Sequence, residues 1–330
     1  MNETAQPAPA WWKRLIDFPL VAMIIAIGLF IAANAAAILA GKYLPPMDQP
    51  FELIAKATLS LTFVWAVYKY AIVRLGARPR DDLPLNGAAK GVGAGVLIGV
   101  VLFSAVVGVA ALADVYNIIG EGGTSQLISA LVAMAILPGF LEELLVRGIL
   151  FRWIEEFAGS WAALAVTSLL FGFGHIVNPN ATVFSSFAIA LEAGLLLGGA
   201  YMLTRNLWLA IGIHAAWNFT QGFVFDVPVS GIDQNGLVEA HLSGPELLSG
   251  GAFGLEASVI AMVLATSAGV AMIVMAIKRD GAVRPWWVQR RLEKAVGVDV
   301  DRDADLGAPL EPAEPVADDV LDIEHPRRMD

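Results

Sequence analysis

Three stretches of the sequence are apolar, carry no charge, and are as long as a lipid bilayer is thick. They cover residues 20–40, 91–113 and 257–277. The hydrocarbon core of a bilayer is about 30 Å thick, and a helix that crosses it needs about 20 such residues. Inside lipid, a single segment satisfies all of its own backbone hydrogen bonds only as a helix. These stretches therefore predict an integral membrane protein made of α-helices.

Five further stretches are mostly apolar but contain ionisable residues; they cover 51–73, 125–153, 161–177, 181–203 and 207–225. Together the eight stretches predict an all-α, polytopic transmembrane helical bundle of about eight spans. Charged residues make up 16% of the chain, against roughly 25% in soluble proteins, which excludes an ordinary water-soluble enzyme. The chain has no cysteine, so disulfides, thiolate metal ligands and cysteine nucleophiles are excluded as well.

Lysine and arginine are distributed unevenly between the two sides of such a bundle. Eight spans place nearly all of them on the side of both termini, and only Lys42 and Lys56 on the other side. Because cytoplasmic loops accumulate positive charge, we expect both termini in the cytoplasm, with the protein in the plasma membrane of a bacterium. The first stretch is longer than the roughly 7 to 15 apolar residues of a cleaved signal peptide, so we expect it to be retained.

Ionisable residues inside the spans are concentrated between residues 142 and 218. A charge at the centre of a membrane helix costs about 2.5–3.5 kcal/mol on insertion scales, so each one needs a partner or a function. Glu143 and Arg147 are four residues apart, share a helix face, and can form an ion pair. Glu142 points about 100° away from that face, so this pairing leaves one carboxylate free.

Two more pairs of residues have the same spacing, Phe171 with His175 and His214 with Asn218. At about 1.5 Å per helical residue, Glu142, His175 and His214 lie roughly 15, 21 and 13 Å below the cytoplasmic ends of their helices. One site near the middle of the membrane can therefore contain all three. A carboxylate, two imidazoles and a carboxamide form a hydrolytic set, with a base for water and hydrogen-bond donors for an oxyanion.

These residues resemble the three motifs of the CPBP family, the CAAX-protease and bacteriocin-processing group of intramembrane proteases, which are also called Abi proteins. The resemblance covers about residues 125–225, and all three motifs occur in order, each inside an apolar stretch. The motif positions are Glu142, Glu143, Arg147, Phe171, His175, His214 and Asn218.

The resemblance implies a glutamate-dependent intramembrane endopeptidase. It assigns Glu142 and His175 to the activation of a water that attacks the scissile carbonyl group. It assigns His214 and Asn218 to stabilisation of the resulting oxyanion. The remaining motif residues would shape the site; they are Glu143, Arg147 and Phe171.

The family is often labelled metalloprotease, which raises the question of a zinc ion. If a metal is present, its ligands would be Glu142, His175 and His214. The helix-borne His-Glu-x-x-His arrangement is absent from the sequence, however. We therefore expect no cofactor and prefer a glutamate-activated water, with zinc as the alternative.

The resemblance further implies a peptide or protein substrate in or at the lipid bilayer, and no nucleic acid as a partner. A prenylated CAAX tail, a leader peptide and other membrane-tethered segments are all open as substrates. A proton-coupled transporter would also bury Glu and His in several helices, and a non-catalytic scaffold of protease descent is a third alternative. Serine and aspartyl intramembrane proteases are disfavoured, because neither Gly-x-Ser-Gly nor Gly-x-Gly-Asp occurs.

Two features inside the spans belong to no motif. Glu192 lies in the middle of a span, and we interpret it as a hydrogen-bonded packing residue, with a place in a substrate cleft as the alternative. Glycines at four-residue spacing are expected to let helix backbones approach closely; they are Gly91, Gly95 and Gly99 in one span and Gly194 and Gly198 in another.

The sequence divides into four predicted parts. Residues 1–124 form N-terminal transmembrane helices, and residues 125–225 form the catalytic helical core. Residues 226–294 contain an extracytoplasmic loop, the last transmembrane helix and a basic amphipathic segment. Eleven acidic and three basic residues lie between 299 and 330, which therefore carry −8 of the formal net charge of −10. We expect residues 295–330 to be a disordered acidic tail without an assigned role.

Overall fold

The computed structural model describes residues 10–296, and most of this range is helical. Residues up to Val288 form one compact unit, and the residues after it belong to a second unit. The longer helices are α2 (Pro19–Gly41), α3 (Phe51–Tyr70), α4 (Ala88–Leu112), α8 (Ser160–Gly174), α9 (Val183–Thr204), α10 (Trp208–Phe219), α12 (Val259–Asp280) and α13 (Trp286–Val296). The predicted acidic tail lies outside the described residues from 297 onward.

Shorter elements complete the fold. One continuous helical segment consists of α5 (Leu127–Ser129), the π-helix η2 (Ala130–Ile136), α6 (Leu137–Glu143), the π-helix η3 (Leu144–Phe151) and α7 (Arg152–Ala158). The others are α1 (Trp11–Ile16), η1 (Ile72–Arg74), η4 (His175–Val177), the π-helix η5 (Thr220–Val224), α11 (Glu246–Ser249), η6 (Gly251–Phe253) and η7 (Leu255–Ala257), with strands β1 (Tyr116–Glu121) and β2 (Val238–Leu242).

Seven helical segments among the described residues are long and apolar enough to cross a membrane. They are Pro19–Gly41, Phe51–Arg74, Ala88–Leu112, Leu127–Ala158, Ser160–Val177, Val183–Thr204 and Val259–Asp280. Each coincides closely with a predicted span. The predicted span at 207–225 forms α10, which has 12 residues and continues into η5 with five more. The all-α, polytopic architecture is therefore confirmed.

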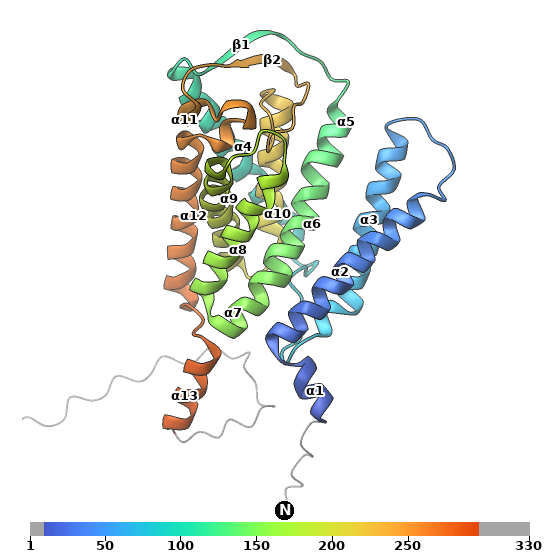
Figure 1. The fold of residues 1–330 in the computed structure, drawn as a ribbon, viewed down its shortest axis with the longest axis vertical. Coiled ribbons are helices and arrows are strands. Elements are labelled where there is room, and N and C mark those ends of the chain that lie inside the picture. The colour runs from blue at the N-terminus through green and yellow to red at the C-terminus, as the bar shows by residue number, and fades with distance from the viewer. Residues whose placement is uncertain (1–9, 297–330) are drawn as a thin grey trace, which may run out of the picture. The chain divides into compact units, whose positions relative to one another are not determined.

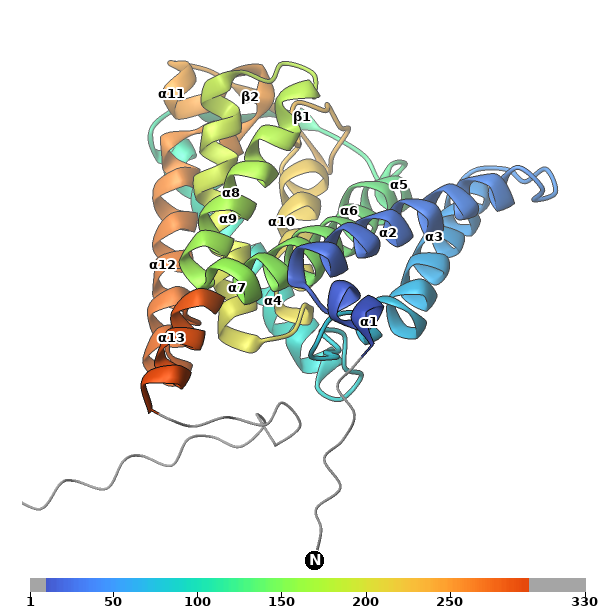
Figure 2. The same cartoon turned by 60° about the horizontal axis from the view of Figure 1, so that its bottom comes forward.

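Helix α9 lies at the centre of the bundle and packs against α8, α10 and α12 (Figure 1). Helix α10 in turn packs along α4. Helices α2 and α3 pack on each other at one edge of the bundle and contact the remaining helices through α6, α7 and the π-helical turns (Figure 2). This arrangement surrounds α9 and α10 with other helices.

Small residues allow α4 and α10 to approach each other closely. A Cβ added to Gly95 would lie 2.4 Å from the carbonyl oxygen of Leu209, and one added to Gly99 would lie 2.6 Å from that of Ile213. Real Cβ atoms do not come this near to backbone atoms, so the helix contact requires glycine at both positions. The close approach expected from the glycine spacing is therefore confirmed for α4.

Replacing Gly95 by alanine is expected to lower the free energy of unfolding by about 1–3 kcal/mol, because the added methyl group meets the backbone of α10. Gly93 of the same helix provides the matched control, since nothing lies within 4 Å of a Cβ added there. Gly93→Ala should leave stability unchanged or raise it slightly, because alanine favours a helix more than glycine does. Thermal unfolding of both variants in detergent tests the contrast, and equal melting temperatures would contradict it.

A two-stranded antiparallel sheet covers one end of the bundle (Figure 1). Strand β1 pairs with β2, with an irregularity in register between Ile118 and Gly120. The carboxylate of Asp226 accepts hydrogen bonds from the backbone N–H groups of Gly236 at 2.8 Å and Ala240 at 3.0 Å. The region predicted only as an extracytoplasmic loop therefore has a defined structure, which the hydropathy pattern did not indicate.

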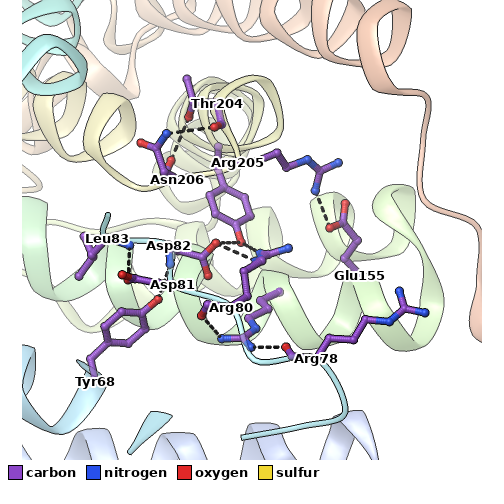
Figure 3. A network of polar contacts seen from close by, with 12 residues as sticks. Tyr68, Arg78, Arg80, Asp81, Asp82, Leu83, Glu155, Thr204, Arg205 and Asn206 are labelled. Carbon is purple, nitrogen blue, oxygen red and sulfur yellow. Dashed lines mark hydrogen bonds and ion pairs between the residues drawn. The ribbon is translucent and has the colours of Figure 1, made fainter. Parts of the chain in front are cut away.

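A network of polar contacts fastens the connection between α3 and α4, residues 75–87 (Figure 3). Asp82 lies at the centre of the network and is fully buried. Its backbone N–H donates to the hydroxyl of Tyr68 at 2.7 Å, and the hydroxyl of Tyr201 donates to its Oδ1 at 3.3 Å. Arg80 forms an ion pair with the same carboxylate, Nε to Oδ1 at 2.8 Å. The connection is therefore bound to both α3 and α9.

Two arginines extend this network to α7. Arg152 donates from its two Nη atoms to the backbone carbonyl oxygens of Arg80 and Arg78, at 2.9 and 3.0 Å. Arg205, at the end of α9, forms an ion pair with Glu155, Nη1 to Oε2 at 2.6 Å. These contacts hold α7, and with it the helical segment that carries the first motif, in a fixed position relative to α9.

Candidate active site

The first motif lies where α6 passes into η3. Glu143 and Arg147 are fully buried, and the Nη1 atom of Arg147 lies 2.7 Å from Oε1 of Glu143. The ion pair expected from the four-residue spacing is therefore present. The Nη2 atom of Arg147 also donates to the backbone carbonyl of Ala193 on α9, at 3.2 Å. The pair thus connects the first motif to the central helix of the bundle.

The first and third motifs meet at His214 of α10. Its Nδ1 lies 2.9 Å from Oε1 of Glu143, the oxygen that also accepts from Arg147. An ionised carboxylate is only an acceptor, so Nδ1 of His214 carries the proton of this hydrogen bond. The Nε2 atom of the same ring lies 3.9 Å from Oε2 of Glu142. One histidine thus links the two glutamates.

Glu142 differs sharply from its neighbour in exposure. Its side chain is 39% exposed, whereas that of Glu143 is fully buried. This contrast follows from the helix, because adjacent residues point about 100° apart. Among the described residues, Glu142 makes its ionic contact with His214, at 3.9 Å. Glu142 is therefore the motif carboxylate that an incoming molecule can reach.

The second motif contributes an aromatic ring and the second imidazole. Phe171 lies on α8, and His175 begins the 3-10 turn that follows this helix. The Nδ1 atom of His175 lies 2.7 Å from the backbone carbonyl of Phe171, so Nδ1 is the donor and Nε2 is left as an acceptor. The Phe171 ring lies 5.0 Å from the His175 ring and 5.9 Å from the His214 ring, between centroids. The guanidinium of Arg147 lies 4.7 Å from the same ring.

Asn218 follows His214 by one turn on α10. Its Nδ2 donates to the backbone carbonyl of Met134 in η2, at 2.9 Å. An amide nitrogen has two protons, so this bond leaves a second donor. The contact also brings the π-helical part of the first motif's segment against the third motif. All three motifs are therefore joined through side-chain contacts.

A small cavity of about 30 Å³ lies beside these residues. This volume suits one or two water molecules, since a single water needs roughly 10–15 Å³ on this measure. Its polar lining residues are His175, His214, Asn218, Ser230, Glu192 and Glu256. Glu142 is not among the lining residues, but its Oε2 atom lies 3.9 Å from Nε2 of His214, which is one of them. The sequence indicates a packing role for Glu192, with a place in a substrate cleft as the alternative, and it does not single out Glu256.

A larger cavity of about 810 Å³ lies on another side of α6 and α10. It is lined almost entirely by apolar side chains of α3, α4, η2, α6 and α10. Phe140, two residues before Glu142, and Ala215, next to His214, both contribute to its wall. The apolar cavity therefore borders the helices that carry the first and third motifs.

The candidate metal ligands do not fit a metal centre. Within residues 10–296, no three His, Asp or Glu side chains form a group that could hold a metal ion. The Nδ1 atoms of His214 and His175 are engaged by Glu143 and by a backbone carbonyl, so only their Nε2 atoms are left for a ligand. A catalytic zinc ion requires three protein ligands converging on one point. The described residues therefore offer no such set of ligands.

Comparison with known proteins finds a family match for part of the chain. Residues 124–220 match the family described as type II CAAX prenyl endopeptidase Rce1-like. The matched segment contains the whole of the first, second and third motifs. No curated protein and no solved structure matches the chain.

Proposed function

We propose that this integral membrane protein hydrolyses a peptide bond of a membrane-tethered substrate, because residues 124–220 match the type II CAAX prenyl endopeptidase Rce1-like family, which is the CPBP family. The observation that carries the proposal is the contact between the first and third motifs. The fully buried Glu143–Arg147 pair holds the Nδ1 side of His214, and the Nε2 side faces the partly exposed Glu142 at 3.9 Å.

The proposed reaction begins with a water between Glu142 and His214. A separation of 3.9 Å is too long for a direct hydrogen bond and suits a bridging water. Glu142 takes one proton from this water while the oxygen bonds to the scissile carbonyl carbon. The C–N bond then breaks, and the proton passes to the nitrogen of the leaving amine. The atoms balance with one water consumed for each bond.

The remaining motif residues act on the charge that develops on the carbonyl oxygen. With its Nδ1 proton held by Glu143, His214 presents Nε2 to the reacting atoms and donates a hydrogen bond when it is protonated there. Asn218 keeps one amide proton that is not used by Met134. His175 serves as the second proton carrier through its Nε2 atom. Donors aimed at a developing oxyanion are among the largest contributions to catalysis.

The apolar cavity supports a lipid-modified substrate over a leader peptide without a lipid. Its volume of about 810 Å³ lies within the range of roughly 300–1,000 Å³ of small-molecule sites. Its lining is apolar, and it borders both α6 and α10. A prenyl chain bound there lies against the two helices that carry Glu142 and His214. We therefore propose a prenylated, CAAX-type peptide as the substrate class.

Two peptides of the same sequence, one farnesylated and one not, test this substrate class. The farnesylated peptide is expected to be cleaved with the higher kcat/KM, and Val96→Trp should remove most of this advantage by filling the apolar cavity. Val101→Trp is the matched control, because Val101 is also an exposed valine of α4 but does not line the cavity. Equal cleavage of the two peptides by the unmodified protein would contradict the proposal.

Cytoplasmic termini and a bacterial plasma membrane stay predictions. They rest on the concentration of lysine and arginine at one side of the predicted bundle.

A further inference from the structure

Glu192 is a buried carboxyl group that the mechanism above does not use. It lies near the middle of α9 and is only 2% exposed. Its Oε2 atom is buried and has no hydrogen-bond partner among the described residues. An ionisable group inside a membrane helix is costly unless it is paired or functional. A packing role for Glu192 therefore does not explain why its Oε2 atom is buried without a hydrogen-bond partner.

A second carboxyl group lies beside it. Glu256 belongs to the short turn η7 that precedes α12, and it is 4% exposed. Its Oε1 accepts a hydrogen bond from the backbone N–H of Ser230. Glu256 is thus oriented by a protein group, whereas Oε2 of Glu192 is not.

Both carboxyl groups line the cavity of about 30 Å³ that also borders His175, His214 and Asn218. A cavity holds water when it offers enough volume and two to four polar partners. This cavity meets both conditions with side chains that come from four separate elements. Water there would supply the partner that Oε2 of Glu192 lacks.

We propose that this cavity is a water site that supplies the hydrolytic reaction, with Glu192 as the positioning residue that holds its water. The inference rests on the proposed function. Peptide hydrolysis consumes one water per bond: its oxygen joins the carbonyl carbon, one proton ends on the amine, and the other stays on the new carboxyl group. The surrounding lipid cannot provide this water. His214 lines the cavity, and its Nε2 atom lies 3.9 Å from Oε2 of Glu142, so this one side chain connects the cavity with the proposed base.

Two substitutions at the same position test the inference in the purified full-length protein with a farnesylated fluorogenic peptide. Glu192→Leu fills the space but cannot accept a hydrogen bond, and it is expected to lower kcat by about tenfold or more with KM unchanged. Glu192→Gln keeps an acceptor oxygen of the same size and should retain most of the activity. Thr266→Val is the control, because it removes a buried, unpartnered oxygen that does not line the cavity.

Melting temperature separates a functional role from a structural one. Because Oε2 of Glu192 makes no hydrogen bond within the described protein, Glu192→Leu should not lower the melting temperature. A wild-type kcat in Glu192→Leu, or a fall in kcat accompanied by an equal loss of thermal stability, would overturn the inference.

A structural readout keeps the inference apart from the proposed function. An experimental map that resolves ordered water should show a water within hydrogen-bond distance of Glu192 in the wild type, and this water should be missing in Glu192→Leu. If the wild type cleaves no peptide but the map contains this water, the proposed function fails and the water site stands. A map without water at Glu192 would reject the site itself.

Discussion

Glu142→Gln is expected to lower kcat by about 10³-fold while leaving the fold intact, because glutamine has the same shape but cannot take a proton from water. General bases contribute typically 10²- to 10⁴-fold. The side chain is 39% exposed and its ionic contact to His214 is long, at 3.9 Å, so its loss disturbs no tight packing. Cleavage of a farnesylated fluorogenic peptide by the purified protein provides the measurement.

Glu239→Gln provides the control for this substitution. Glu239 is an exposed residue of β2, remote from the motif helices, and the same chemical change there should leave kcat unchanged. Wild-type turnover in Glu142→Gln would refute the assignment of Glu142 as the base.

Proton-coupled flux in a protein that cleaves no peptide would favour the transporter instead. A chelator is expected to leave the turnover of the wild-type protein unchanged. If the chelator abolishes turnover and added zinc restores it, the reaction depends on a metal and the metal-free mechanism is wrong.

Arg147→Met should cause the largest loss of stability among single substitutions in the motifs. It removes the arginine of the buried ion pair and leaves the Glu143 carboxylate with only the His214 ring, and breaking a buried ion pair from one side costs about 3–5 kcal/mol. It also removes the hydrogen bond to the carbonyl of Ala193 and the contact with the Phe171 ring. Thermal unfolding in detergent should show a marked fall in melting temperature.

Two further variants test whether the unpaired buried charge causes the loss of stability in Arg147→Met. Arg279→Met breaks the exposed pair with Asp280, whose side chains are 54% and 42% exposed, and should melt close to the wild type. The double variant Glu143→Leu/Arg147→Met removes both buried charges and should regain much of the lost stability. Its activity should stay low, because Nδ1 of His214 then has no carboxylate to orient it. A double variant as unstable as Arg147→Met alone would show that the charge imbalance is not the cause.

Much of the membrane architecture was predictable from local pattern. The uncharged stretch 257–277 became the helix Val259–Asp280, and the stretch 20–40 became Pro19–Gly41. The ion pair between Glu143 and Arg147 followed from their separation alone, since both lie on one helix. The four-residue glycine spacing likewise indicated the close approach of α4 to another helix. The roles of the motif residues in catalysis stay predictions.

Other features had no counterpart in the local pattern. The sheet of β1 and β2 joins segments more than 100 residues apart, and neither strand carries a long alternating sequence. The carboxyl groups of Glu192 and Glu256 line the same cavity although they lie on different elements. For Glu192 the sequence offered one signal, because an ionisable residue lies in the middle of a span. It offered none for the second, which lies in a short turn outside the spans.

The sequence by itself determined which segments cross the membrane and which side chains share a helix face, because hydropathy and helical periodicity act between residues close together along the chain. Only the tertiary structure decided that Nδ1 of His214 contacts Glu143, that its Nε2 faces Glu142, and that the same residue lines a polar cavity. Those contacts join different helices. Their geometry depends on how closely the helices pack and how they are rotated about their axes, and neither quantity is encoded in any single stretch of the chain.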